Sequence, residues 1–124
     1  MAKRVALVGH CGADRSYLHI AVASASRGIE IVSADDEQSL NRVLDEGVDL
    51  ILFNRILDYG FREDEGVEMI RRLRAAYPKV KMMLVSNFAD AQQAAIAAGA
   101  VPGFGKREIG SERMKQALCS ALSD

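Results

Sequence analysis

Short apolar runs alternate with amphipathic stretches five times along this chain, and this alternation constrains the fold more than any other feature. Continuous apolar runs are typical of parallel strands that are buried on both faces, whereas apolar residues at helical spacing indicate helices that cover a sheet. Parallel strands joined by right-handed helical crossovers satisfy this pattern. The sequence therefore predicts an α/β fold with a doubly wound five-stranded parallel sheet and five helices, in three α/β/α layers.

The boundaries of the predicted elements come from residues that begin or end helices. Asp36 and Asp90 are expected N-caps, Gly28 and Pro78 are expected to end helices, and Pro102 makes the last strand irregular or places it at a sheet edge. A chain of 124 residues fits one domain, residues 1–124. The expected strands are 5–8, 29–32, 50–53, 80–85 and 101–104, and the expected helices are 14–27, 36–46, 67–77, 91–98 and a last one from about 111.

Composition excludes several classes of function. The net charge of −1 and the pI of about 6.1 give no electrostatic reason to expect nucleic acid or an anionic membrane as a partner. No apolar run approaches the ~20 residues that span a bilayer, and no signal-peptide core follows Met1. Cys11 and Cys119 lie at opposite ends of the chain, and their spacing indicates neither a disulfide framework nor a zinc site. The expected location is the cytoplasm.

One basic cluster interrupts this even distribution of charge. Arg71, Arg72 and Arg74 follow one another within a predicted helix. An anion site and a solvated helix face both account for them, and the solvated face is the preferred interpretation because helix faces opposite an apolar stripe are usually charged.

Candidate site residues come directly after the predicted strands. The carboxyl ends of parallel strands meet at one edge of an open sheet, and ligands of such folds bind there. The residues at this edge are Gly9, His10, Cys11, Asn54, Ser86 and Lys106.

These features together resemble the receiver domain of bacterial two-component response regulators. The resemblance covers nearly the whole chain and rests on the five-fold β/α count, on Asp49–Asn54 and on Met83–Ser86 at two strands, and on Gly99-Ala100 followed by Lys106. It implies a flavodoxin-like sheet with strand order 2-1-3-4-5. It also implies a site in which an aspartate accepts a phosphoryl group and an adjacent acidic pair helps it to bind Mg²⁺.

The aligned positions lack these carboxylates. Asn54 stands at the phosphoacceptor position, and Gly9 and His10 stand at the acidic pair. An asparagine amide is a poor nucleophile, and Mg²⁺ prefers carboxylate and water oxygens, so the resemblance implies neither a metal nor phosphorylation at position 54. We therefore expect Asn54→Asp alone not to restore phosphorylation.

Two receiver positions are retained. Ser86 matches the hydroxyl residue that bonds the phosphoryl group, although a serine at a strand end also bonds local backbone. Lys106 matches the phosphate-pairing lysine and is expected to contact the Asn54 amide oxygen, Asp58 or water. Gly103 stands where receivers carry a switch aromatic. Phe104 follows one residue later, on the opposite face unless the strand is bulged.

The predicted function is that of a pseudo-receiver, a protein-binding module without enzymatic activity or cofactor. Receiver partners mostly dock on the face that corresponds here to residues 91–98, 101–104 and the last helix. The identity of the partner and the oligomeric state do not follow from the sequence.

Three alternatives remain. Phosphorylation at Asp14, Asp35 or Asp58 is one. A phosphatase-like thiolate at Cys11 with Arg15 is another, although the spacing is too short for that signature and Asp14 would repel phosphate. A redox or metal role of His10 and Cys11 is the third, against the preferred interpretation of a buried or partly buried thiol beside a solvated imidazole.

Overall fold

A computed structural model describes residues 3–25, 27–57 and 60–123, and it forms an α/β fold with a parallel sheet. Within these residues the sheet has four strands in the order β2-β1-β3-β4, and all neighbouring strands run parallel. The strands are β1 (Arg4–Val8), β2 (Glu30–Ala34), β3 (Leu50–Asn54) and β4 (Lys81–Val85). The helices are α1 (Gly12–Ala25), α2 (Glu37–Glu46), α3 (Gly66–Ala76), α4 (Ala89–Ala97) and α5 (Glu112–Leu122), with a short 3₁₀ helix at Lys106–Glu108.

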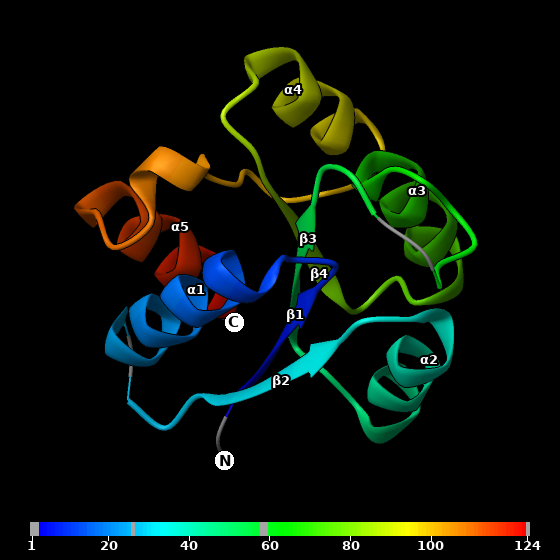
Figure 1. Cartoon of the computed structure of the whole chain (residues 1–124), viewed down its shortest axis with the longest axis horizontal. Coiled ribbons are helices and arrows are strands. Elements are labelled where there is room, and N and C mark those ends of the chain that lie inside the picture. Colours follow the sequence, from blue (N-terminus) through cyan, green and yellow to red (C-terminus); the bar gives the residue numbers. More distant parts are fainter. Residues whose placement is uncertain (1–2, 26, 58–59, 124) are drawn as a thin grey trace.

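Helices cover both faces of the sheet, as the sequence predicts (Figure 1). Side chains alternate along each strand between two apolar clusters, because successive strand residues point to opposite faces. On β3, Ile51 and Phe53 pack with α2, α3 and α4, whereas Leu50 and Leu52 pack with α1 and α5. Both faces are therefore buried, which explains the continuous apolar runs. No helix among the described residues is long and apolar enough to cross a membrane.

Two of the predicted helix starts are confirmed and one is wrong. Asp36 caps α2 by accepting a hydrogen bond from the Ser39 backbone N–H, and Ser111 caps α5 through the Met114 N–H. Asp90 is not an N-cap, since α4 begins at Ala89 and Asp90 lies in its first turn. The helix begins earlier because Ser86 Oγ accepts the Phe88 N–H at 3.2 Å and turns the chain directly after β4.

The predicted fifth strand is wrong as a strand, and residues 101–104 form only an isolated bridge between Val85 and Phe104. The Val101 N–H donates to Met82 O at 2.9 Å, and the Ser86 N–H donates to Phe104 O at 3.0 Å. A regular parallel ladder that starts from the first bond would place residue 103 in the second, so one extra residue bulges out between them. The Pro102 residue, which has no N–H, lies in this bulge.

A side chain of α4 takes over part of the missing ladder. Gln92 Nε2 lies 2.9 Å from Leu84 O, 3.1 Å from Ser86 O and 3.2 Å from Phe104 O. An amide group has two N–H donors, so these carbonyl oxygens share them. Gln92 thus ties the segment 101–105 to β4 where backbone hydrogen bonds between them are few.

Candidate functional site

The side chain of Asn54 joins the ends of β1 and β3 at the carboxyl edge of the sheet. Its Nδ2 donates to Gly9 O at 3.2 Å and to Ile56 O at 2.9 Å. Both partners are carbonyl oxygens, which can only accept, so the group that faces them must be the amide NH₂. A carboxylate has no donor in its ionised form. The surroundings of position 54 therefore favour an amide over an ionised carboxylate.

Gly9 adopts a backbone conformation that few other residues reach. Its φ is +79°, in the left-handed region, and a Cβ built on it would overlap Leu57. Leu57 is 3 % exposed and belongs to the core cluster beneath α2 and α3. An acidic side chain at position 9 would therefore be strained at this φ and would displace a terminal methyl group of Leu57.

His10 is buried, which corrects the prediction of a solvated imidazole. It is 7 % exposed, its Nε2 lies 2.8 Å from Leu52 O, and its Nδ1 is buried with no hydrogen-bond partner among the described residues. Because Leu52 O can only accept, Nε2 carries the proton of the neutral ring. Burial lowers the pKa of His10 below its ordinary value of 6.5; the Lys106 charge also lowers it, while the Leu52 bond and Asp14 raise it.

Cys11 is exposed, so the prediction of a buried or partly buried thiol is also wrong. Its backbone oxygen accepts the Arg15 N–H at 2.8 Å, and its Sγ accepts the Asp14 N–H at 3.5 Å. The residue therefore begins α1 and keeps its thiol at the helix surface. Cys119 is free and exposed as well.

Lys106 pairs with Asp14, a partner that the sequence analysis did not assign to it. Lys106 Nζ lies 3.0 Å from Asp14 Oδ2, and both side chains are partly buried. The hydrogen bond from Lys106 lowers the pKa of the Asp14 carboxyl. Of the partners expected for Lys106, the Asn54 amide oxygen makes no hydrogen bond with it among the described residues, and Asp58 lies outside those residues. The sequence feature that could have predicted this pair is the position of Asp14 in the first turn of the helix after β1, at the same sheet edge as Lys106.

Ser86 and the segment after α4 are held by local hydrogen bonds. Ser86 is 4 % exposed, and its hydroxyl accepts the Phe88 N–H, which is the local backbone role named above. The segment 101–104 is bulged, and Phe104 lies in the core cluster of α1 and α5 with 1 % exposure. A Cβ at Gly103 would overlap Leu84 O, so the position of the switch aromatic holds a close backbone contact.

The residues at this edge do not fit a magnesium ion. Gly9 has no side chain, the His10 ring is bonded to Leu52 O, and Asn54 directs N–H groups at its neighbours. Mg²⁺ needs several oxygen ligands, usually with at least one carboxylate. Asp14 is the carboxylate paired with Lys106 there, and within residues 3–25, 27–57 and 60–123 no three His, Cys, Asp or Glu side chains are grouped to hold a metal.

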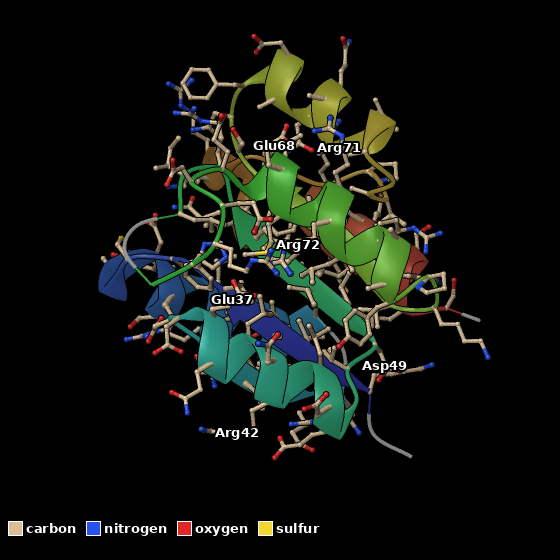
Figure 2. The ribbon with its side chains drawn as sticks, turned by 90° about the vertical axis from the view of Figure 1, so that its right-hand side faces the viewer. Glu37, Arg42, Asp49, Glu68, Arg71 and Arg72 are labelled. Atoms are coloured by element: carbon tan, nitrogen blue, oxygen red, sulfur yellow. The ribbon has the colours of Figure 1, made fainter. Side chains whose placement is uncertain are left out.

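The predicted basic cluster is not one solvated face. The side chain of Arg72 extends from α3 toward Glu37 of α2 (Figure 2). It bonds Glu37 at 2.9 Å and Glu63 at 2.5 Å, and about a quarter of it is exposed. Glu63 lowers the acidity of the guanidinium, so the pKa of Arg72 is raised. Arg71 pairs with Glu68 on the exposed surface of α3, and Arg74 bonds Pro78 O. Arg72 therefore links α3 to α2 and Arg74 links α3 to the turn that follows it, whereas Arg71 is a solvated surface residue.

No protein-family model matches the chain, and no curated protein matches it in sequence. Solved structures do match. NtrX from Brucella abortus superposes with a TM-score of 0.81 at 19 % identity, over 98 % of this chain and 28 % of NtrX. The non-phosphorylated receiver domain of the stress response regulator RcsB from Escherichia coli superposes with a TM-score of 0.77 at 10 % identity, over 97 % of this chain and 92 % of that domain.

A third structure agrees with these two. The signal receiver domain of a DNA binding response regulator from Colwellia psychrerythraea gives a TM-score of 0.76 at 12 % identity, over 98 % of this chain and 99 % of that domain. Each match is nearly complete on the side of this chain. The chain therefore has the fold of response-regulator receiver domains, and it spans about a quarter of the NtrX chain.

Proposed function

We propose that this chain is an atypical receiver domain that regulates a partner protein by direct contact, without phosphorylation at position 54 and without an enzymatic activity of its own. The observation that carries the proposal is the pair of hydrogen bonds from Asn54 Nδ2 to Gly9 O and Ile56 O. They make the amide at position 54 part of the structure of the edge.

The surroundings of Asn54 support the same proposal. Phosphoryl transfer depends on a nucleophile and on positive charge that offsets the developing charge on the phosphoryl oxygens. An amide is a far weaker nucleophile than a carboxylate. Lys106 is paired with Asp14 at 3.0 Å, and a carboxylate at position 9 would be strained at the left-handed φ and would displace a methyl group of Leu57. The amide of Asn54 thus stands in place of the nucleophile, and Gly9 stands in place of a metal ligand. The cation Lys106 is paired with Asp14.

Phosphorylation at another aspartate and a phosphatase-like Cys11 receive no comparable support. Asp14 and Asp35 are ion-paired to Lys106 and Arg15 respectively, and no group of three His, Cys, Asp or Glu side chains in the described part of the chain could hold a metal beside either carboxylate. Asp58 lies outside the described residues. The Asp14 backbone N–H donates to Cys11 Sγ, and the negative charge of the Asp14 carboxylate would repel a phosphate that approaches the thiol. We therefore keep the binding module as the proposed function.

The proposed contact face is formed by α4, residues 101–105 and α5. It corresponds to the face through which receiver domains mostly meet their partners. In this chain it exposes Ile96, which is 47 % accessible, and it contains the bulged segment at the sheet edge. A fixed local structure at this face is compatible with constitutive binding.

The test is a titration with Mg²⁺ and beryllofluoride, a mimic of the phosphoryl group, followed by amide chemical shifts. We expect the amides of Asn54, Ser86 and Lys106 to stay in place at saturating concentrations. The Cys11→Ser variant, titrated in parallel, checks that any shift near the start of α1 does not come from the thiol. Saturable shifts at Asn54 and Lys106 would show that the edge still binds a metal or a phosphoryl group, and the proposal would then fail.

A further inference from the structure

Two hollows lie along the segment 101–105 and adjoin at Gly103 and Arg113, which line both of them. One has a volume of 350 Å³ and extends toward Lys81 and Ser120, and the other has a volume of 380 Å³ and extends toward Ser86 and Arg107. Together they border the sheet edge beyond β4 on the sides of α5 and α4. Gly103 is half-buried and lines both hollows, while the side on which it lacks a Cβ packs against Leu84 O of β4.

The backbone of this segment has unused hydrogen-bonding groups. Neither Pro102 nor Gly103 makes a hydrogen bond to any of the residues described, because the bulge carries them past the ladder with β4. Pro102 is exposed and Gly103 is half-buried. Unpaired strand edges with free N–H and C=O groups are the surfaces to which an extended peptide adds. Gly103 offers one donor, and the carbonyl groups of Pro102 and Gly103 offer acceptors.

Basic residues outnumber acidic ones around the two hollows. Lys81, Arg107 and Arg113 line them, and Glu108 is the one acidic residue among their lining residues. Arg113 pairs with Glu108 at 2.9 Å, so Lys81 and Arg107 remain as the excess positive charge. Lys81 Nζ bonds the backbone oxygen of Ser123, which neutralises no charge. Since the whole chain carries a net charge of −1, this positive edge is a local feature.

We propose that this edge groove binds an extended acidic segment of a protein partner, which pairs with the backbone of Gly103 and sets its carboxylates against Arg107 and Lys81. The inference rests on the proposed function, because it names the kind of partner that the face of α4, residues 101–105 and α5 receives. Backbone pairing accounts for the extended conformation of the partner, and the local positive charge accounts for its acidity.

The probe for the test is a fluorescein-labelled decapeptide in which valine and glutamate alternate. Two matched peptides accompany it, one with lysine in place of glutamate and one with alternate backbone amides N-methylated, which keeps the charge but removes donors. Fluorescence anisotropy measures affinity, and the amide signal of Gly103 reports its shift and its protection from hydrogen exchange.

The protein variants separate local charge from overall charge. Arg107→Glu reverses a charge beside Gly103, whereas Lys115→Glu makes the same change on the part of α5 that faces the groove with α1. We expect saturable binding of the glutamate peptide, protection of the Gly103 amide, and an affinity about tenfold lower for Arg107→Glu and for the N-methylated peptide. Lys115→Glu should change the affinity less than twofold.

Three outcomes would overturn the inference. The first is no saturable binding at millimolar peptide, and the second is equal binding of the lysine or N-methylated peptide. The third is a dimer in sedimentation that Arg107→Glu dissociates, since a second copy of the chain would then occupy the groove. The beryllofluoride titration distinguishes the two proposals. If the peptide fails to bind and beryllofluoride still leaves Asn54 unshifted, only the strand-addition inference fails. If beryllofluoride shifts Asn54 while the peptide binds, only phosphorylation independence fails.

Discussion

Lys106 Nζ lies 3.0 Å from Asp14 Oδ2, and this ion pair connects the segment after the sheet edge to the first turn of α1. The acid comes from a helix that follows β1, while the end of β3 carries a neutral amide. Lys106 therefore has a carboxylate partner, but this partner is Asp14 of α1 and not a residue at the end of β3.

Asp14→Asn should lower the free energy of unfolding by about 0.5 kcal/mol at pH 7, because the pair is partly exposed and screened. The pKa of Asp14 is below its ordinary value of 3.8, so the pair stabilises the fold above that pH and the contribution disappears as the pH falls through the folded-state value. Urea unfolding at pH 7 and pH 3 measures both effects. A cycle with Lys106→Met is the control, and a coupling energy of zero would contradict the ion pair.

Asn54→Asp should destabilise the fold by about 2 kcal/mol at pH 7, because an ionised carboxylate would face Gly9 O and Ile56 O without a donor. The loss should shrink at pH 4, where the protonated carboxyl regains one O–H donor. Denaturant unfolding at both pH values checks this, and acetyl phosphate with Mg²⁺ should leave the variant unmodified.

Asn87→Asp is the matched control for this substitution. Asn87 Oδ1 accepts the Arg107 N–H at 3.0 Å, so a carboxylate keeps that bond and the change should cost less than about 0.5 kcal/mol. Equal losses at the two positions would show that the donor role of the Asn54 amide is wrong.

The buried His10 should make the fold less stable in mild acid. The folded-state pKa is lowered from 6.5, so the unfolded chain takes up the proton first and the free energy of unfolding falls as the pH drops from 6.5 to the folded-state value. His10→Gln keeps an N–H for Leu52 O and should remove this slope. Unfolding between pH 7.5 and pH 5 measures it, with His19→Gln on exposed α1 surface as the control. If the pH dependence of the free energy of unfolding were unchanged in His10→Gln, His10 would not be the group that causes it.

The alternation of strands and helices and most helix boundaries were predictable from the sequence because they depend on local pattern and capping, as at Asp36 and Ser111. The fifth strand was not, since Pro102 marks an irregularity but does not say that Gln92 replaces ladder bonds from another element. The partners of Lys106 and His10 depend on how α1 lies on the sheet edge. A resemblance to a family predicts which residues stand at the site positions. It does not predict which hydrogen bonds and ion pairs those side chains make in this chain.

Arg72→Met should lower the free energy of unfolding by about 2 kcal/mol, since it leaves the partly buried Glu37 and Glu63 without their cation. Arg71→Met is the control on the same helix, and it should cost about 0.3 kcal/mol because Arg71 and Glu68 are exposed. Thermal and urea unfolding measure both variants. Similar losses for the two would mean that Arg72 also acts as a surface charge.

Gly103→Ala tests the bulge that removes the fifth strand. A Cβ at this position would overlap the backbone oxygen of Leu84, which cannot move without disturbing β4. The segment must therefore shift outward, which weakens the bond from Val101 N–H to Met82 O and the bond from Ser86 N–H to Phe104 O. The expected loss is about 2 kcal/mol, in the range of overpacked sites.

Gly12→Ala supplies the control for Gly103→Ala. No atom lies within 4 Å of the Cβ that it would add at the first residue of α1, so the change should leave stability unchanged or raise it by about 0.5 kcal/mol. Hydrogen exchange locates the effect: in Gly103→Ala the amides of Val101 and Ser86 should lose protection while that of Leu52 in β3 keeps it. A Gly103→Ala variant with wild-type stability and protection would mean that the segment is free to move away from β4, and the bulge would then be a soft feature of the edge instead of a fixed one.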